Sequence, residues 1–194
     1  MNTMTQTLRD RTQLIWVEDT RGRTAVSVVV FALLAAFSAQ IAVHLPLTPV
    51  PVTFQPLIVV LAGVLLGPRA GALSMAAYVT VGAMGAPIFS FGGAGLPWLL
   101  GPTGGYLFAA PAAAFVAGLV SGRGDVAWRL FLGLTLGVST MYAGGVAQLM
   151  MMTSQGLGAA MALGVIPFVV GDVMKVLFGF FAVFGVRKTL GRNG

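Results

Sequence analysis

The sequence predicts an all-α membrane protein with six transmembrane helices, and three observations support this fold class. Of its 194 residues, 57% are hydrophobic and only 8% are charged, which is far from the composition of a soluble domain. Six apolar segments alternate with short connections, and about 20 apolar residues span a bilayer as a helix. All basic residues except Lys175 fall in the tails or in connections on one side, so both termini are expected in the cytoplasm.

The limits of the six spans follow from the residues that interrupt the apolar runs. Four prolines between residues 46 and 56 preclude a regular helix and predict an extended outer connection that leads into a short second span. A Gly-Pro-Arg sequence at 67–69 predicts a tight turn, because glycine commonly ends helices and proline commonly begins them. The expected spans are 25–45, 56–66, 70–85, 104–120, 130–152 and 163–186.

Pairs of small residues four positions apart indicate where helices approach one another closely. Such pairs occur in the first and fifth spans. They are Ala32 with Ala36, Ala35 with Ala39, and Gly133 with Gly137. On the first span, the face with Ala32 and Ala36 could receive a partner helix, or it could pack inside the bundle itself.

Residues 86–101 are apolar, aromatic and rich in glycine. We expect them to form a long outer loop that is too broken to be helical and that folds back over the protein. Gly92 and Gly93 are candidate ligand contacts, and they give this loop backbone freedom that other residues would restrict. The loop is therefore a candidate lid.

A single six-helix transmembrane domain is expected at residues 24–188. Residues 1–23 are polar, contain acidic side chains and lack the apolar core of a signal peptide, so we expect a cytoplasmic N-terminal segment. Residues 189–194 are expected to form a cytoplasmic tail.

Composition excludes several classes of function. The chain has no cysteine and one histidine, so disulfides, thiolate catalysis and a Cys or His metal site are not expected. The net charge of +6 could suggest nucleic acid as a partner, but the basic residues follow the pattern that orients a membrane protein. We therefore expect the chain to lie in a lipid bilayer and not to bind nucleic acid.

Two charges, Asp172 and Lys175, interrupt the last apolar run, and no other membrane-length segment carries one internally. Their spacing of three residues places both on one face of a helix, where they can neutralise each other. Such groups are costly in a membrane and commonly mark a functional site. Entered from outside at Pro167, the helix would place the pair about 8 and 12 Å below its start. Alternatively, the ion pair of Asp172 and Lys175 could serve only to fix the packing of the helix.

Catalysis is not expected from these residues. No lysine lies in a phosphate-binding GxxxxGK[ST] loop, and Asp172 has no partner aspartate on another span. We therefore predict a binding pocket under the outer loops rather than an enzyme. Its uncharged polar candidates are Thr53, Gln55, Tyr78, Tyr106, Tyr142 and Gln148, and its apolar walls are Phe54, Phe91 and Trp98. Each tyrosine or glutamine could instead serve as a hydrogen bond between helices.

Three motifs resemble a known family. The run PVPVTFQPLIVVLAGVLLGPRAG, the run FGGAGLPWLLGPTGGY and GDVMK in the last span closely resemble the BioY family, the biotin-specific S components of energy-coupling factor (ECF) transporters. The resemblance covers about residues 25–187. It implies a six-helix fold in a prokaryotic cytoplasmic membrane, with a pocket near the outer surface that is capped by outer loops.

The same resemblance implies roles for particular residues and partners. Asp172 and Lys175 would hold the head group of biotin, the transported ligand, and Ala32 and Ala36 would dock a transmembrane coupling subunit. No cofactor is implied, since ATP would be used only by the ATPase subunits. A substrate-capture subunit of this kind and a self-sufficient secondary carrier or channel both remain open, as does a homo-oligomer.

Overall fold

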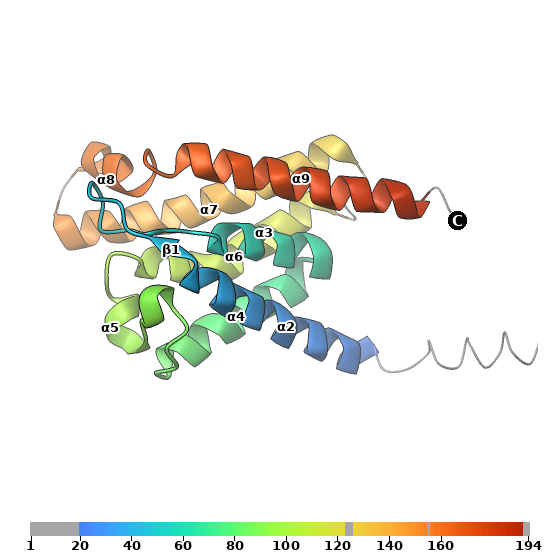
Figure 1. Cartoon of the computed structure of the whole chain (residues 1–194), viewed down its shortest axis with the longest axis horizontal. Coiled ribbons are helices and arrows are strands. Elements are labelled where there is room, and N and C mark those ends of the chain that lie inside the picture. The colour runs from blue at the N-terminus through green and yellow to red at the C-terminus, as the bar shows by residue number, and fades with distance from the viewer. Residues whose placement is uncertain (1–19, 123–125, 155, 192–194) are drawn as a thin grey trace, which may run out of the picture.

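The chain forms a bundle of long helices, as seen in a computed structural model that describes residues 20–122, 126–154 and 156–191. In Figure 1, α7 and α9 run together along one side of the bundle and α2 and α4 along the other, with α3 and α6 between them. The long helices are α2 (Thr20–Gln40), α3 (Gln55–Leu66), α4 (Pro68–Ala83), α6 (Gly104–Ser121), α7 (Ala127–Thr153) and α9 (Val169–Gly191).

Short elements gather at one end of the bundle, and the described chain begins and ends at the other (Figure 1). Two short strands form an antiparallel hairpin in which Ala42 pairs with Thr53 and Val43 with Val52. The short elements are β1 (Ala42–Val43), β2 (Val52–Thr53), the 3-10 turn η1 (Ser90–Gly92), α5 (Gly95–Leu99) and α8 (Leu157–Gly164).

Four helices in the described residues are long and apolar enough to cross a membrane. They are Gly22–Gln40, Gly104–Ser121, Ala127–Thr153 and Val169–Lys188. Helices α3 and α4 have 12 and 16 residues, fewer than the roughly 20 that a perpendicular crossing needs. The membrane character of the chain is thus clear in its helices, while the number of crossings stays a prediction.

Glycines allow the central helices to touch backbone to backbone. A Cβ on Gly63 of α3 would collide with the carbonyl oxygen of Ala114 in α6, and one on Gly105 of α6 would collide with that of Gly144 in α7. Gly137, half of the predicted GxxxG pair, lies against Val60 and Ala117. This close packing leaves little freedom between α3, α6 and α7, which form the rigid inner frame of the bundle.

Two predicted spans end or begin at the wrong residue. The first helix ends at Gln40 rather than at 45, because the following residues enter the β hairpin. The last helix begins at Val169 rather than at 163, because residues 157–164 form α8 and a turn follows it. Asp172 therefore lies in the first turn of α9, about 4.5 Å along the helix axis from Val169.

The prediction that residues 86–101 contain no helix was wrong. Positive φ angles at Gly92 and Gly95 do break the segment, but η1 ends at the first of these glycines and α5 begins at the second. Pro97 is compatible with α5 because it lies in the first turn, where a backbone N–H has no partner within the helix. The strict all-α prediction also missed the β1–β2 hairpin.

The described helices extend slightly beyond the predicted transmembrane domain. Helix α2 begins at Thr20, four residues before the expected start at 24, and α9 continues to Gly191 past the expected end at 188. Most of the predicted N-terminal segment 1–23 and the last three residues of the tail lie outside the described residues.

Candidate ligand-binding site

A cavity lies beneath the short elements, between the hairpin, the α5 segment, the first turns of α6 and α9 and the middle of α7. The space between its lining atoms is about 620 Å³, a figure that includes open solvent at the mouth. The lining residues are Val50, Pro51, Thr53, Gln55, Pro56, Ser90, Trp98, Thr103, Tyr106, Leu107, Val138, Met141, Tyr142, Phe168, Asp172 and Lys175.

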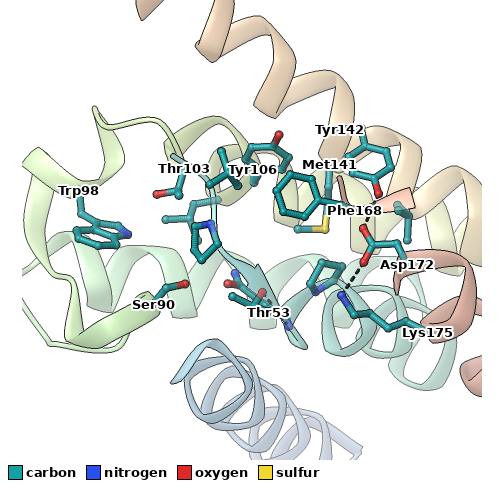
Figure 2. Close-up of a pocket in the computed structure, with 16 residues that line it drawn as sticks. Thr53, Ser90, Trp98, Thr103, Tyr106, Met141, Tyr142, Phe168, Asp172 and Lys175 are labelled. Atoms are coloured by element: carbon teal, nitrogen blue, oxygen red, sulfur yellow. Dashed lines mark hydrogen bonds and ion pairs between the residues drawn. The ribbon is translucent and has the colours of Figure 1, made fainter. Parts of the chain in front are cut away.

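A buried ion pair forms one end of this cavity. The ammonium Nζ of Lys175 lies 2.6 Å from Oδ1 of Asp172, and their side chains are 11% and 6% exposed. The second carboxylate oxygen, Oδ2, accepts a hydrogen bond from the hydroxyl of Tyr142 at 2.6 Å. Helix α9 thus supplies both charges one turn apart, and α7 orients the carboxylate from the side (Figure 2).

The cavity is elongated. Figure 2 shows Trp98 at the end opposite Asp172 and Lys175, with Tyr106, Met141 and Phe168 between the two ends. Hydroxyl groups of Ser90 and Thr103 lie toward the Trp98 end. A ligand with a polar head, an apolar middle and a second polar end would match this distribution.

Gln55 contributes a buried amide to the cavity wall. Its side chain is 6% exposed, and Nε2 has no hydrogen-bond partner in the described part of the chain. The residue opens α3 directly after β2, where its backbone N–H donates to Oγ1 of Thr53 at 3.3 Å. An unpaired buried donor is costly, so an acceptor on a bound ligand would remove a penalty that the empty site carries.

Tyr106 is held in place by a hydrogen bond to α8. Its hydroxyl donates to the carbonyl oxygen of Gly164, at the end of α8, at 2.6 Å. The ring therefore serves as cavity wall while its polar group is already paired. The predicted candidates that line the cavity are Asp172, Lys175, Thr53, Gln55, Tyr106, Tyr142 and Trp98.

The structure corrects the predicted positions of the other aromatic candidates. Tyr78 is fully buried outside the cavity, and its hydroxyl donates to the carbonyl oxygen of Ile88 at 3.3 Å. Phe54 is 50% exposed and does not line the cavity, and its ring centre lies 5.9 Å from Nζ of Lys175. Phe91 does not line the cavity, and its ring stacks on that of His44 with the ring centres 3.9 Å apart. Sequence cannot separate these residues from Tyr106 or Tyr142, since only packing decides where each ring points.

Gly92 and Gly93 also lie beside the cavity rather than on its surface. Gly92 has a φ of 72°, and a Cβ on Gly93 would collide with the ring of Trp98. These glycines therefore shape the segment that carries Trp98. Gln148, another candidate, donates from Nε2 to the carbonyl oxygens of Leu99 and Gly101 at 2.9 and 2.6 Å, so it fastens the end of α5 to α7.

Several cavity residues had no signal in the sequence. Most are apolar residues, such as Val138, Met141 and Phe168, which look like any other residue of a membrane helix. Ser90 and Thr103 could have been proposed, because they are polar residues in connections that were expected on the outer side.

The predicted docking residues Ala32 and Ala36 are partly buried on α2 and pack against the core, whereas Ala35 and Ala39 are fully buried. The exposed face of α2 is formed by larger residues. They are Val26, Val29, Val30, Leu33, Leu34 and Phe37. The small-residue pair therefore lies at the margin between the bundle and this apolar face.

Comparison with known proteins decides the family. The model of the BioY family matches residues 6–192, almost the whole chain. The chain belongs to the BioY family. This confirms the resemblance seen in the three sequence motifs.

Named relatives agree with this assignment. The "Probable biotin transporter BioY" of Pyrococcus horikoshii is 42% identical over 148 residues, covering 76% of this chain and 86% of the relative. The "Biotin transporter BioY" of Thermotoga maritima is 36% identical over 167 residues, covering 86% and 96%. Relatives in the BioY family thus carry transporter names, in keeping with the prediction of transport rather than catalysis.

A solved structure shares the fold. The crystal structure of the S-component for biotin from an ECF-type ABC transporter superposes with a TM-score of 0.80, covering 89% of this chain and 94% of that one. The two sequences are only 22% identical. The helical arrangement in Figure 1 is therefore that of an ECF S-component.

Proposed function

We propose that this chain captures biotin at the outer face of a prokaryotic cytoplasmic membrane, as the substrate-specific subunit of an ECF-type transporter. The single observation that carries the proposal is the hydrogen-bonded group of Asp172, Lys175 and Tyr142 at the end of an open cavity in a BioY chain. Its hydrogen-bonding capacity complements the ureido ring of biotin.

The complementarity can be counted. An ionised carboxylate offers about four acceptor positions, and Lys175 and Tyr142 use two of those on Asp172. An ammonium has three donors, and Asp172 takes one. Two acceptor positions and two donors are then left for a ligand. The ureido group of biotin has two N–H donors and one carbonyl acceptor. The free acceptor positions of Asp172 can accept from the N–H groups, and the free donors of Lys175 can donate to the carbonyl oxygen.

The rest of biotin suits the remainder of the cavity. Its sulfur-containing ring would lie among Met141, Phe168 and Tyr106, and its aliphatic chain would run toward Trp98. The carboxylate at the end of that chain would come near the hydroxyl groups of Ser90 and Thr103. The unpaired Nε2 of Gln55 is a further donor for an oxygen of the ligand.

We infer six membrane crossings with both termini in the cytoplasm. Helices α3 and α4 are short, so they would cross a locally thinner or protein-packed region. The Gly-Pro turn that joins them lies at the end of the bundle opposite the cavity, as a crossing by both helices requires. Arg69, Arg187 and Lys188 lie at that same end. The positive-inside rule then favours a cavity that opens to the outside.

The chain would not energise transport itself. ATP would be hydrolysed by separate ATPase subunits, and a transmembrane coupling subunit would dock on α2 at the margin with Ala32 and Ala36, next to the exposed apolar face. We expect no cofactor and no metal ion in the site.

A competition experiment tests the head-group assignment. Labelled biotin is bound to the purified chain in lipid nanodiscs and displaced with two analogues. Desthiobiotin keeps the ureido ring but lacks the thioether, and it should compete at concentrations close to those of biotin. A diamine analogue without the ureido carbonyl should compete poorly. Equal competition by the diamine, or no binding of biotin at all, would contradict the proposal.

A further inference from the structure

The last residue of α2, Gln40, joins this helix to the wall of the cavity. Its Nε2 donates to the carbonyl oxygen of Phe89 at 2.9 Å and to that of Ile88 at 3.2 Å. Its Oε1 accepts a hydrogen bond from the backbone N–H of Gly92 at 3.2 Å. One amide side chain thus donates to two carbonyl oxygens and accepts from one N–H group in residues 88–92, the segment that contains the η1 turn.

The turn held by Gln40 sends three consecutive side chains in three directions. Phe89 is fully buried and lies edge-on against Tyr78 with ring centres 5.6 Å apart. Ser90 lines the ligand cavity. Phe91 points outward and stacks on His44. A shift of this turn would therefore move a cavity residue together with the outer surface.

The backbone of the turn is unfavourable by itself. Phe91 has φ 56° and ψ 29°, in the left-handed region that residues with a bulky side chain rarely adopt. Gly92 follows with a φ of 72°. Such a conformation persists only where surrounding contacts hold it. Backbone hydrogen bonds within residues 89–93 contribute, and the contacts from outside the turn include the Gln40 amide, the buried Phe89 ring and the His44 stack.

We propose that Gln40 is a positioning residue that keeps the η1 turn closed against the cavity and so slows the escape of bound ligand. Because Gln40 belongs to α2, the turn follows any displacement of this helix. Most of the outward surface of α2 is apolar and exposed, so a partner helix that docks there would act on Ser90 through Gln40. This inference rests on the proposed function, since it concerns the retention of biotin.

The test replaces Gln40 by methionine, which has nearly the same length but neither donates nor accepts these hydrogen bonds. The full chain in nanodiscs should release biotin about tenfold faster, the effect of roughly one net hydrogen bond. The association rate should change by less than about twofold. Backbone amides of residues 88–92 should exchange hydrogen faster before ligand is added.

The matched control is Ser38→Ala, which removes a side-chain hydrogen bond within α2, from Oγ to the carbonyl oxygen of Ala35 at 2.9 Å. It should leave both rates and the exchange of residues 88–92 unchanged. Gln40→Glu is a second variant. It keeps an acceptor for Gly92 but faces the carbonyl oxygens of Ile88 and Phe89 with a carboxylate, so it should also release biotin faster.

The outcomes separate this inference from the proposed function. Normal release from both Gln40 variants would overturn the positioning role, even if amide exchange increased. An equal acceleration by Ser38→Ala would overturn it too, because the effect would then belong to α2 in general. Failure of the unmodified chain to bind biotin would instead remove the proposed function.

Discussion

The hydroxyl of Tyr142 donates a 2.6 Å hydrogen bond to Oδ2 of Asp172, so α7 holds the carboxylate that α9 carries. Oδ1 of the same carboxylate faces Lys175. Since α7 packs tightly on α6 while α9 is largely exposed, this hydrogen bond fixes a peripheral helix relative to the rigid inner frame. The geometry of the proposed head-group site therefore depends on both helices.

Replacing Tyr142 by phenylalanine should weaken biotin binding about 10-fold while leaving the bundle folded, because one charge-assisted hydrogen bond to Asp172 is lost. Calorimetric titration of the purified variant measures the affinity. Tyr78→Phe is the matched control. It removes a hydroxyl outside the cavity, and the carbonyl oxygen of Ile88 keeps Gln40 as a donor. Equal losses in the two variants would show that Tyr142 acts only through stability.

Single replacements in the ion pair should abolish binding and destabilise the protein. Lys175→Met or Asp172→Asn leaves the other group buried without its partner, which costs on the order of 3 to 5 kcal/mol when a buried charge remains. The double variant removes both charges and should recover stability without recovering binding. Affinity and thermal unfolding are measured for all three proteins. Near-native biotin affinity in the double variant would refute the site assignment.

Replacing Gln55 by leucine should change stability and binding in opposite directions. The substitution removes a buried donor that has no partner in the described residues, so the ligand-free protein should become more stable by roughly 1 kcal/mol. Biotin should bind more weakly, because a donor in the cavity is lost. Thermal unfolding without ligand measures the expected gain in stability, and equilibrium binding measures the expected loss of biotin affinity. A less stable variant with unchanged affinity would assign Gln55 to packing alone.

Tryptophan at Ala32 or Ala36 should leave biotin binding by the isolated chain intact while preventing assembly with a coupling subunit, because a large ring keeps a partner helix from backbone contact. For each variant, copurification with the coupling subunit measures assembly, and biotin titration of the isolated chain measures binding. Ala35→Trp marks the internal face. Ala35 is fully buried, so this variant should fail to fold. If Ala32→Trp and Ala36→Trp behave like Ala35→Trp, the docking assignment is wrong.

The long helices and the pairing of Asp172 with Lys175 could be predicted from the sequence, because both depend on residues that are close together in the chain. Apolar runs indicated the long helices, and the spacing of Asp172 and Lys175 was enough to place them on one helical face. The hairpin, α5 and α8 are short, and their existence depends on contacts with segments far away in the chain. The hydrogen bond from Thr48 to the carbonyl oxygen of Leu163 is such a contact.

The cavity was predictable only in part for a similar reason. Three tyrosines occur in the expected spans, and sequence offers no basis for ranking them. Packing decides that Tyr142 reaches Asp172, that Tyr106 lines the cavity and that Tyr78 is buried beside the η1 turn. The partners of Gln40 and Gln148 lie nearly 50 residues away, so their roles could not be inferred from local patterns.

Transport by the chain alone tests most directly whether it is a capture subunit. Proteoliposomes that contain only this protein are supplied with labelled biotin outside, and bound and internal biotin are separated by rapid filtration with excess unlabelled ligand. The proposed function predicts saturable binding without accumulation, and ATP-dependent uptake once the coupling and ATPase subunits are added. Accumulation of biotin inside vesicles that hold this chain alone would contradict it and identify a self-sufficient carrier.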